Sequence, residues 1–529
     1  MENKEVPRWA GALAGLTAGG VALAVAQVVA SLVNPAAFPV VAVGAATVDL
    51  TPAPVKDWAI RSFGENDKTV LITGVLLVLA VIAAGLGVLS LRSPRYGQAG
   101  LAAFAVIGLL AVLSRPGAIA MDALPTVVGV AAGMLALPWL LGRATTRLPS
   151  PAADASPEGE ADRPAVMRAG AEVYAFDRRR LLTGVAGGAV VAGAGALAGG
   201  YLSGRRVADT ARSALALPAP AVPAEALPPG VDFRLKGLTP FVTPNKDFYR
   251  VDTALIVPHV DPATWTLRVH GLVDRPVELT YADLLGRPLT EADITLTCVS
   301  NEVGGPYAGN ARWLGVRMAD VLREAGIQRG ADMLLSRSAD GWTCGTPVEV
   351  VMDGRDALFA IAMNGEALPA AHGYPVRQVV PGLYGYVSAT KWVVDVKVTR
   401  FDTDEAYWTP RGWAAKGPIK TQSRIDLPAP NSSLSPGRTT IAGVAWAQHT
   451  GVSAVEVRVD RGVWRQARLA QVPGPDTWRQ WSLDWDATPG EHTVEVRATD
   501  AAGRTQTEQV APPDPDGASG WHTISVRVA

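Results

Sequence analysis

The 529-residue sequence has few cysteines, few charged residues and no excess of either charge. Its two cysteines, Cys298 and Cys344, are too few for a disulfide framework or a four-cysteine metal site. No Cys-x-x-Cys-His motif occurs, which excludes covalently attached c-type haem. The 48 basic and 49 acidic residues give a net charge of -1, so no overall charge attracts nucleic acid.

The motifs of several large enzyme classes are also missing. The sequence contains no GxSxG nucleophile motif, no HExxH zinc motif, no phosphate-binding P-loop and no nucleotide-binding fold opened by GxGxxG. The acids Asp353, Asp356 and Glu366 are scattered over a segment predicted as strand and turn. We therefore predict that these three side chains lie on the solvated surface.

Charged residues make up only 18% of the chain, and the first 205 residues contain long stretches that are apolar and uncharged. Each is long enough to cross a hydrocarbon core, which takes roughly 20 helical residues. Buried helices of a large soluble protein are the alternative, but the stretches lack the polar stripe of such helices. We predict an all-α transmembrane bundle of four spans in residues 1–145 and a fifth span at 181–204, from the stretches Ala10–Val33, Thr69–Leu91, Tyr96–Ser114, Ala123–Leu141 and Leu181–Gly204.

Basic residues in short loops favour the cytoplasmic side of a membrane and so predict the orientation of the spans. Arg92 and Arg95 lie between the second and third stretches without an acid beside them. The longer loop 34–68 has mixed charge, which suits the outside. This pattern predicts a cytoplasmic amino terminus, a cytoplasmic linker at 146–180, and an extracytoplasmic position at the cell membrane for everything after Arg205.

The sequence DRRRLLTG at Asp177–Gly184 precedes the fifth stretch, which is rich in glycine and alanine and only mildly apolar. Paired arginines before such a segment resemble a twin-arginine export signal, here with Arg178 and Arg179 as the pair. An ordinary positive-inside membrane anchor has the same features. The residues alone leave both interpretations open.

The predicted bundle contains no histidine, because all six histidines lie between His259 and His522. Histidines are the usual axial ligands of b-type haem, so we expect no haem in the bundle. A transporter would need polar groups within the spans, which offer little beyond Gln27. The predicted bundle is therefore expected to serve as a membrane anchor or as a docking surface for a partner.

After the fifth stretch the composition indicates a tether and two globular domains. Residues 205–234 include a run rich in alanine and proline and are predicted to form an extended tether. Residues 235–424 mix short alternating strands with few helices, which is typical of an α+β domain. One amphipathic helix is predicted to end at Gly326, with an apolar face formed by Leu314, Met318, Val321, Leu322 and Ala325.

Residues 425–529 show only the patterns of strands. Val455, Val457 and Val459 alternate with polar residues, and similar alternation recurs up to the end of the chain. Several short strands with turns between them, in about 100 residues, predict an all-β immunoglobulin-like sandwich.

Two segments combine residues that suit a metal or an anionic ligand. Cys298 follows a β-rich run and precedes a polar, Gly-rich loop, a position from which a thiolate can bind a soft metal. The alternative is a buried free cysteine that packs as a small apolar group. The segment Ala371–Trp392 places basic and hydroxyl side chains among glycines and prolines, which suits a phosphate-bearing ligand and equally a solvated loop.

Five sequence pieces, in this order, resemble the sulfite oxidase family of molybdopterin-dependent oxidoreductases. The resemblance covers residues 235–403 and, more weakly, the C-terminal domain as far as Ala529. It rests on PNKDFYR at Pro244–Arg250, TLTCVSN at Thr295–Asn301, GNARWLGV at Gly309–Val316, MNGEALPAAHGYPVR at Met363–Arg377 and VVPGLYGYVSATKW at Val379–Trp392.

The resemblance implies a molybdopterin cofactor whose molybdenum is ligated by Cys298, with Arg250 in the substrate or cofactor pocket. It also implies that the C-terminal domain is the one that often mediates dimers in this family. A molybdenum cofactor is inserted in the cytoplasm, so the protein must cross the membrane folded, which favours the twin-arginine interpretation. The residues implied to line the pterin and its phosphate are Asn245, Phe248, Tyr249, Ser338, His372, Arg377, Ser388, Ala389, Thr390 and Lys391.

The sequence also departs from the family pattern. Val303 lies five residues after Cys298, where sulfite-oxidising members have an arginine, and Val251 and Asp252 replace an Asn-His pair. A divalent oxyanion needs several positive groups around it. We therefore predict weak oxidation of sulfite and a better reaction with a neutral or singly charged S- or N-oxide. Cys344 is predicted to pack in the interior.

We expect an exported, membrane-anchored oxidoreductase that transfers an oxygen atom and two electrons at molybdenum. Its expected partners are a small oxyanion or an S- or N-oxide as substrate, a separate electron carrier, membrane lipid and a second copy of the chain, but no nucleic acid. One alternative is reduction of an S- or N-oxide at the same site. A second is a non-catalytic membrane assembly or binding module that keeps the fold, which the presence of Cys298 argues against.

Overall fold

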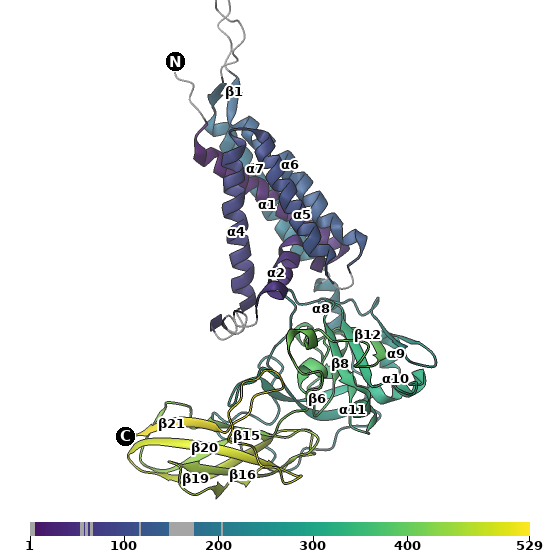
Figure 1. The fold of residues 1–529 in the computed structure, drawn as a ribbon, viewed down its shortest axis with the longest axis vertical. Coiled ribbons are helices and arrows are strands. Elements are labelled where there is room, and N and C mark those ends of the chain that lie inside the picture. Colours follow the sequence, from purple (N-terminus) through teal and green to yellow (C-terminus); the bar gives the residue numbers. More distant parts are fainter. Residues whose placement is uncertain are drawn as a thin grey trace, which may run out of the picture. The chain divides into compact units, whose positions relative to one another are not determined.

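The computed structural model describes residues 6–52, 55, 58, 62–63, 67–115, 118–147, 174–202 and 205–529. The chain divides into two compact units, one reaching to Arg206 and including Ala254–Ile256, the other containing the remaining residues to Ala529 (Figure 1). Most of the predicted cytoplasmic linker, residues 148–173, lies outside the described residues.

In its described part the N-terminal unit consists mainly of helices. Five of them are long and apolar enough to cross a membrane, by length and composition, and they coincide with the five predicted stretches to within a few residues. A shorter apolar helix lies in the predicted outer loop and was missed; Pro39 at its first turn fits the backbone of a helix start. The helices are α1 (Arg8–Val33), α2 (Pro39–Leu50), α4 (Asp67–Ser90), α5 (Pro94–Leu113), α6 (Leu124–Arg143) and α7 (Arg178–Leu202).

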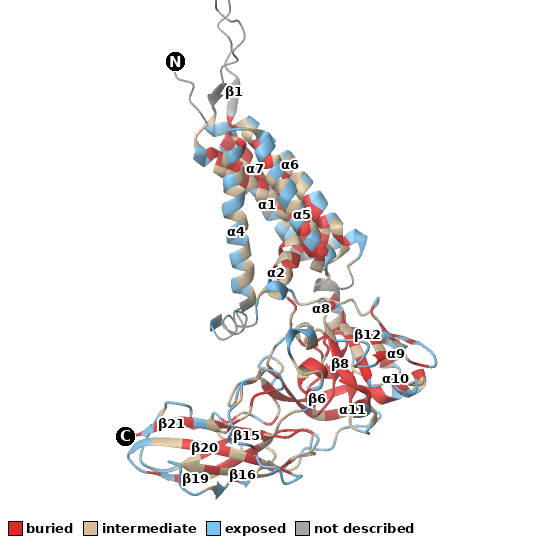
Figure 2. Cartoon of the chain, viewed as in Figure 1, coloured by how far each residue is buried: buried red, intermediate tan, exposed pale blue. Residues whose placement is uncertain are grey.

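Small residues let these helices approach closely. A Cβ added at Gly87 of α4 would lie 2.1 Å from the carbonyl oxygen of Gly11 in α1, and one at Gly15 would lie 2.0 Å from that of Ala83. The backbones of α1 and α4 are therefore in direct contact, as in other apolar helix pairs built on small residues. Buried residues cluster where helices face one another, whereas much of α4 is exposed (Figure 2).

Replacement of Gly87 by alanine tests this contact. The added methyl group would overlap the backbone of α1, so we expect Gly87→Ala to lower the free energy of unfolding by about 1–3 kcal/mol. Gly85→Ala, two residues away in the same helix and with nothing within 4 Å of the added Cβ, should be neutral or slightly stabilising. Thermal unfolding in detergent measures both, and equal effects would contradict the close packing of α1 on α4.

The first domain of the second unit, called the α+β domain below, contains one antiparallel sheet and one mixed sheet, in which β12 pairs in parallel with β3. Their strand orders are β10-β9-β6-β5, with β11 also paired to β9, and β4-β3-β12-β7-β8. Apolar residues of both sheets and of the helices share one core. The strands are β3 (Thr266–Gly271), β4 (Val277–Thr280), β5 (Thr290–Thr297), β6 (Ala308–Arg317), β7 (Met333–Ser338), β8 (Thr343–Pro347), β9 (Leu358–Met363), β10 (Glu366–Ala367), β11 (Arg377–Val379) and β12 (Val393–Thr399), and the helices are α9 (Tyr281–Leu285), α10 (Met318–Ala325) and α11 (Val348–Met352).

Two predictions for this region are wrong in detail. Leu314 lies in β6, where it pairs with Ala362 of β9, so the amphipathic helix α10 begins only at Met318. The predicted tether begins as a helix, α8 (Arg205–Ala214), because its alanines and arginines precede the first proline. The rest is extended but ordered, since Leu215 and Leu217 pack against the core.

The second domain, called the C-terminal sandwich below, has the predicted two-sheet architecture. Its sheets have the orders β13-β15-β19-β18 and β14-β21-β20-β16-β17, and apolar residues from both fill the space between them. The strands are β13 (Gln422–Leu427), β14 (Ser433–Leu434), β15 (Gly437–Trp446), β16 (Val452–Val459), β17 (Arg465–Gln466), β18 (Arg468–Leu469), β19 (Arg479–Ala487), β20 (Gly490–Asp500) and β21 (His522–Val528).

Candidate functional site

Cys298 lies directly after β5, in the turn that leads towards β6. Its backbone N–H donates to the Tyr307 carbonyl at 2.9 Å, and its own carbonyl accepts from the Asn301 N–H at 3.1 Å. The side chain is 9% exposed, and burial raises the pKa of the Cys298 thiol, while Ser300 and Lys391 lower it. The thiol therefore stays neutral unless a metal or a further cation stabilises the thiolate.

Two stacked aromatic rings lie close to this thiol. The ring centroids of Phe248 and Tyr249 are 5.3 Å apart, and the rings of Phe248 and His372 meet edge to face with their centroids 5.7 Å apart. Burial raises the pKa of Tyr249 above its usual range, and the nearby Cys298 raises it further. A Cβ at Gly309 would lie 2.8 Å from the Phe248 ring, so only glycine leaves room for it against β6. The pair forms a flat aromatic surface near the thiol.

Two buried cations belong to the same cluster. Arg377 of β11 is 3% exposed, and its guanidinium lies over the Trp313 ring at 5.0 Å. Lys391 is 9% exposed, and its Nζ contacts Asp252 at 2.8 Å. Burial lowers the pKa of Arg377 to about 10 and that of Lys391 to about 8. Both charges have lost hydration, so an anionic ligand would be stabilised here.

His372 packs against this group with one ring nitrogen unsatisfied. Its Nε2 is 3.2 Å from the Asn245 carbonyl oxygen, whereas its buried Nδ1 has no hydrogen-bond partner among the described residues. Burial, Lys391 and Arg377 lower the pKa of His372 to about 3, so the ring is neutral near pH 7. A buried unsatisfied nitrogen costs about 1–3 kcal/mol, which indicates a ligand that completes the site.

Asp252 is the acid that pairs with Lys391 and with a third cation, Arg250. Its carboxylate contacts Arg250 Nε at 2.9 Å and Lys391 Nζ at 2.8 Å. Within the described part of the chain, the hydrogen bonds of Arg377 go to carbonyl oxygens and not to a carboxylate. The cluster of Arg250, Arg377 and Lys391 against Asp252 is therefore net positive.

The other residues implied by the family resemblance lie in loops, apart from Ser338 at the end of β7, and each makes hydrogen bonds or apolar contacts within the protein. Asn245 donates to Met363 O at 3.2 Å, Ser388 to Leu383 O at 3.0 Å and Tyr384 O at 2.9 Å, Thr390 contacts Ser336 Oγ at 2.7 Å, the Ser338 hydroxyl accepts from Asp340 N at 3.4 Å, and Ala389 packs on the same core as Phe248.

Two further side chains singled out by the sequence have contacts outside the charged cluster. Val303 lies against the C-terminal sandwich, where its Cγ2 would be 3.7 Å from a Cβ at Gly520. Cys344 is fully buried beside Thr346, with its Sγ 3.8 Å from that hydroxyl, and burial raises the pKa of its thiol to about 11. The position of Cys344 agrees with the predicted packing role.

Sequence reasoning missed three contributors to the site. Trp313 supports Arg377, Tyr307 lies 6.3 Å from Tyr249, and Asp252 joins two cations. In the sequence Asp252 is recognisable only as a departure from the family pattern. An acid two residues after Arg250 was the available signal for this ion pair.

Comparisons with known proteins agree with this geometry. The family described as "Oxidoreductase molybdopterin binding domain" matches residues 254–408, and the family described as "Bacterial Ig domain" matches residues 422–496. Sulfite oxidase from Gallus gallus is 30% identical over 321 residues, which cover 51% of this chain and 69% of that protein. The chain belongs to the sulfite oxidase family of molybdopterin oxidoreductases.

Further relatives extend the comparison. The mitochondrial sulfite oxidase of Homo sapiens is 30% identical over 345 residues, covering 55% of this chain and 62% of that protein. The solved structure of the sulfane dehydrogenase SoxCD from Paracoccus pantotrophus is 27% identical and covers 55% of this chain and 82% of that chain, with a TM-score of 0.48. The chain thus spans between 62% and 69% of the length of the two sulfite oxidases.

The family makes this chain a molybdenum-dependent oxidoreductase with a molybdopterin-binding domain. The residues present fit that cofactor. The buried Nδ1 of His372 lacks a partner among the described residues, and Arg377 and Lys391 provide positive charge for a phosphate. The stacked pair Phe248 and Tyr249 offers a flat surface for a planar ring system.

The pKa of Lys391, about 8, gives a pH test of the anion site. The protonated amine favours a bound anion, so the affinity of the cofactor-free chain for inorganic sulfate should be highest below pH 8 and fall as the pH rises through it. Lys391→Arg should remove this fall, because the guanidinium stays charged. Titration calorimetry measures the affinities, and Lys246→Arg, at an exposed lysine, is the control. A pH-independent affinity of the unaltered chain for sulfate would contradict the assignment of Lys391 to an anion site.

Proposed function

We propose that this chain is a membrane-anchored, exported oxidoreductase in which Cys298 ligates molybdenum and an oxygen atom and two electrons are transferred to or from a small substrate. The observation that carries the proposal is the position of Cys298, at the end of a buried strand and beside a buried, net positive cluster. A metal site built from several protein side chains is not supported as an alternative, since no group of three His, Cys, Asp or Glu side chains suited to a metal occurs among the described residues.

Different residues of the site would bind different parts of the cofactor. Cys298 would supply a soft thiolate to the metal, and metal binding would overcome the raised pKa of its thiol. Arg377, Lys391 and His372 would hold the phosphate, and Tyr249 would contact the pterin. When bound, the cofactor supplies the two-electron chemistry. Its surroundings fix its orientation and exclude water.

Replacement of Cys298 tests the metal ligand. In Cys298→Ser a hard, weakly acidic hydroxyl replaces the thiolate. Removal of a residue that only supports a metal ligand costs about 10- to 100-fold in activity, so loss of the ligand itself should lower molybdenum-dependent turnover by more than that. The fold and much of the pterin content should remain. Cys344→Ser, at the other buried cysteine, should keep both metal and turnover. Metal analysis and steady-state kinetics give the result, and near-normal turnover of Cys298→Ser would overturn the proposed ligand.

We further propose that the substrate is neutral or singly charged, with reduction of an S- or N-oxide as the alternative to oxidation of a sulfite-like donor. Asp252 neutralises part of the positive charge of Arg250 and Lys391. Val303 contributes no charge, and Arg312 is paired with Asp293 at 2.7 Å. A doubly charged oxyanion therefore meets fewer available cations than the number of basic residues suggests.

Asp252→Asn tests this view of substrate charge. Loss of the carboxylate frees Arg250 for an anion, and one charge-assisted contact is worth about 1.5–3 kcal/mol. We expect the KM for sulfite to fall by about tenfold or more, with little change for a neutral S-oxide. Asp247→Asn, at an exposed acid in the same segment, is the control. Cofactor content is measured in each variant, and an unchanged KM for sulfite at equal content would contradict the role of Asp252.

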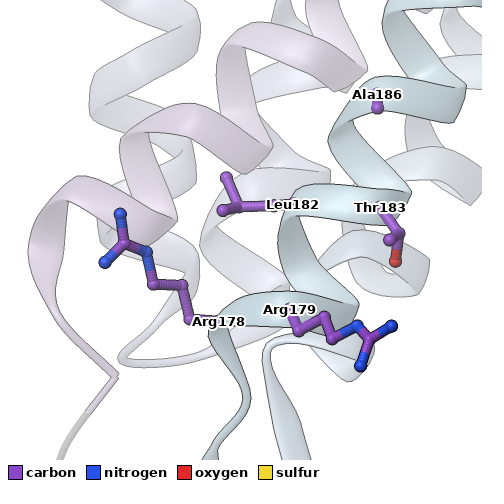
Figure 3. Close-up of a pocket in the computed structure, with 5 residues that line it drawn as sticks. All are labelled: Arg178, Arg179, Leu182, Thr183 and Ala186. Carbon is purple, nitrogen blue, oxygen red and sulfur yellow. The ribbon is translucent and has the colours of Figure 1, made fainter.

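We also propose that the five apolar helices span the cell membrane and that the catalytic domain, from residue 235, and the C-terminal sandwich lie on the extracytoplasmic side. The supporting features are the length and composition of the helices and the arginines at the start of α7. Figure 3 shows Arg178 and Arg179 at that start, with Leu182, Thr183 and Ala186 on the following turns. Electrons would pass to or from a separate carrier, and lipid and a second copy of the chain are further proposed partners.

Conservative replacement of the arginine pair tests the export route. Arg178→Lys with Arg179→Lys keeps the positive charge but changes the pair that a twin-arginine signal requires. The catalytic domain should then stay in the cytoplasm, as judged by protease protection or a reporter fused after Gly230. Arg92→Lys with Arg95→Lys, in another predicted cytoplasmic loop, is the matched control. Normal export of the first variant would contradict the twin-arginine interpretation, and α7 would then be an ordinary membrane anchor.

A further inference from the structure

Strand β5, which ends one residue before Cys298, lies at the edge of its sheet. The strand order β10-β9-β6-β5 gives it one strand neighbour, β6, on which Thr297 pairs with Ala308. The opposite edge of an outer strand presents backbone N–H and C=O groups that need other partners. Those partners determine how firmly the end of β5 is held.

The C-terminal sandwich supplies the partners for the last part of this edge. The Thr295 N–H donates to the Asp476 carbonyl at 2.9 Å, and the Thr295 hydroxyl accepts from the Trp478 N–H at 2.7 Å. The side-chain amide of Gln448 donates to the Thr295 carbonyl at 3.2 Å and to the Thr297 hydroxyl at 2.9 Å. All these contacts lie one to three residues before Cys298.

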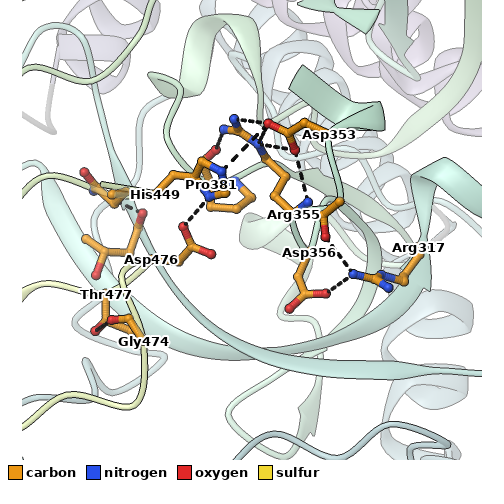
Figure 4. A network of polar contacts seen from close by, with 12 residues as sticks. Arg317, Asp353, Arg355, Asp356, Pro381, His449, Gly474, Asp476 and Thr477 are labelled. Carbon is orange, nitrogen blue, oxygen red and sulfur yellow. Dashed lines mark hydrogen bonds and ion pairs between the residues drawn. The ribbon is translucent and has the colours of Figure 1, made fainter. Parts of the chain in front are cut away.

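Gln448 is buried, and the loop that carries it is bonded to a neighbouring loop of the sandwich. Its side chain is 4% exposed. The next residue, His449, donates its backbone N–H to the Pro475 carbonyl at 3.1 Å, and its Nδ1 lies 3.3 Å from the Asp476 carboxylate. Figure 4 shows His449 and Asp476 facing each other, near the ion-paired Asp353 of the α+β domain. The two loops of the sandwich that contact β5 are thus fastened to each other.

The segment after Cys298 is held by the same domain. Arg424 of β13 donates from Nη1 to the Gly305 carbonyl at 3.0 Å. A Cβ at Gly304 would lie 2.2 Å from the ring of His522, so this loop packs directly on β21. Ala308, at the start of β6, shares an apolar core with Trp446 and Trp478 of the sandwich. The chain on both sides of the cysteine is therefore fixed from the sandwich.

We propose that the C-terminal sandwich positions the Cys298 thiol, with Gln448 as its principal positioning residue. This inference rests on the proposed function, in which the thiol must meet a metal at a fixed place. Removal of the Gln448 amide leaves the Thr295 carbonyl and the Thr297 hydroxyl without their donor, so the end of β5 opens more often. The α+β domain alone does not complete the hydrogen bonding of this strand end.

Alkylation of Cys298 in the cofactor-free, full-length chain tests the proposal without any turnover. In a Cys344→Ser background only Cys298 can react, and its rate with iodoacetamide reports how often the segment opens. We expect Gln448→Met, which keeps the side-chain length but has no amide, to react about tenfold faster. Gln448→Glu, which cannot donate when ionised, provides a second variant should the first fail to fold.

The matched control is Gln422→Met, which removes a buried hydrogen bond of 2.7 Å to the Ala518 carbonyl, within the sandwich itself. Gln422→Met should lose about as much thermal stability as Gln448→Met. Its alkylation rate should nevertheless stay within about twofold of that of the Cys344→Ser parent. Equal acceleration in Gln448→Met and Gln422→Met would show general loosening and overturn the proposal, as would an unchanged rate in both Gln448 variants.

A second readout uses the loaded enzyme. If the thiol is a metal ligand, Gln448→Met should shift its sulfur-to-molybdenum absorption band and lower kcat more than it changes KM, while Gln422→Met should do neither. Failure of the proposed function would appear separately, as metal retention and turnover in Cys298→Ser. The positioning role would then be judged on the alkylation rates alone.

Discussion

Positive charge that is buried next to a thiol is the constraint on which the site depends. Arg377 and Lys391 have little contact with water, and burial lowers the pKa of both. Such charges are tolerated only when the surrounding groups are fixed and well matched to them. Strand β11 fixes Arg377 by pairing with the fully buried strand β9, and Asp252 pairs with Lys391. The proposed anion site is therefore largely formed by the scaffold in advance of a ligand.

The same scaffold depends on contacts between the two domains of the second unit. Trp446 and Trp478 of the sandwich share an apolar core with Phe241 and Ala308, which precede and flank the site. Polar contacts then select one register, since Thr295 is bonded through its N–H, its carbonyl and its hydroxyl. An apolar core provides most of the stability of such an interface, whereas directional hydrogen bonds fix its geometry.

Features that depend on neighbours along the chain could be predicted from the sequence. The apolar stretches, the alternating strands of the sandwich and the strand end at Cys298 are of this kind. The start of α10 could not be placed, because Leu314 suits a helix face and a buried strand equally. The direction of Val303 and the pairing of Asp252 with Lys391 depend on segments far apart in sequence. A single sequence contains no signal for such contacts beyond residue type.

The order of events in biogenesis follows from these long-range contacts, given the proposed function. Gln448 and Thr295 are separated by 153 positions, so the end of β5 is completed only after the sandwich has been synthesised and folded. With Cys298 as the proposed ligand, stable insertion of the cofactor would follow folding of the whole second unit. A chain folded around its cofactor in the cytoplasm cannot be threaded through a membrane unfolded. Export of the proposed kind would therefore need a route for folded proteins, which the proposed twin-arginine role of Arg178 and Arg179 would provide.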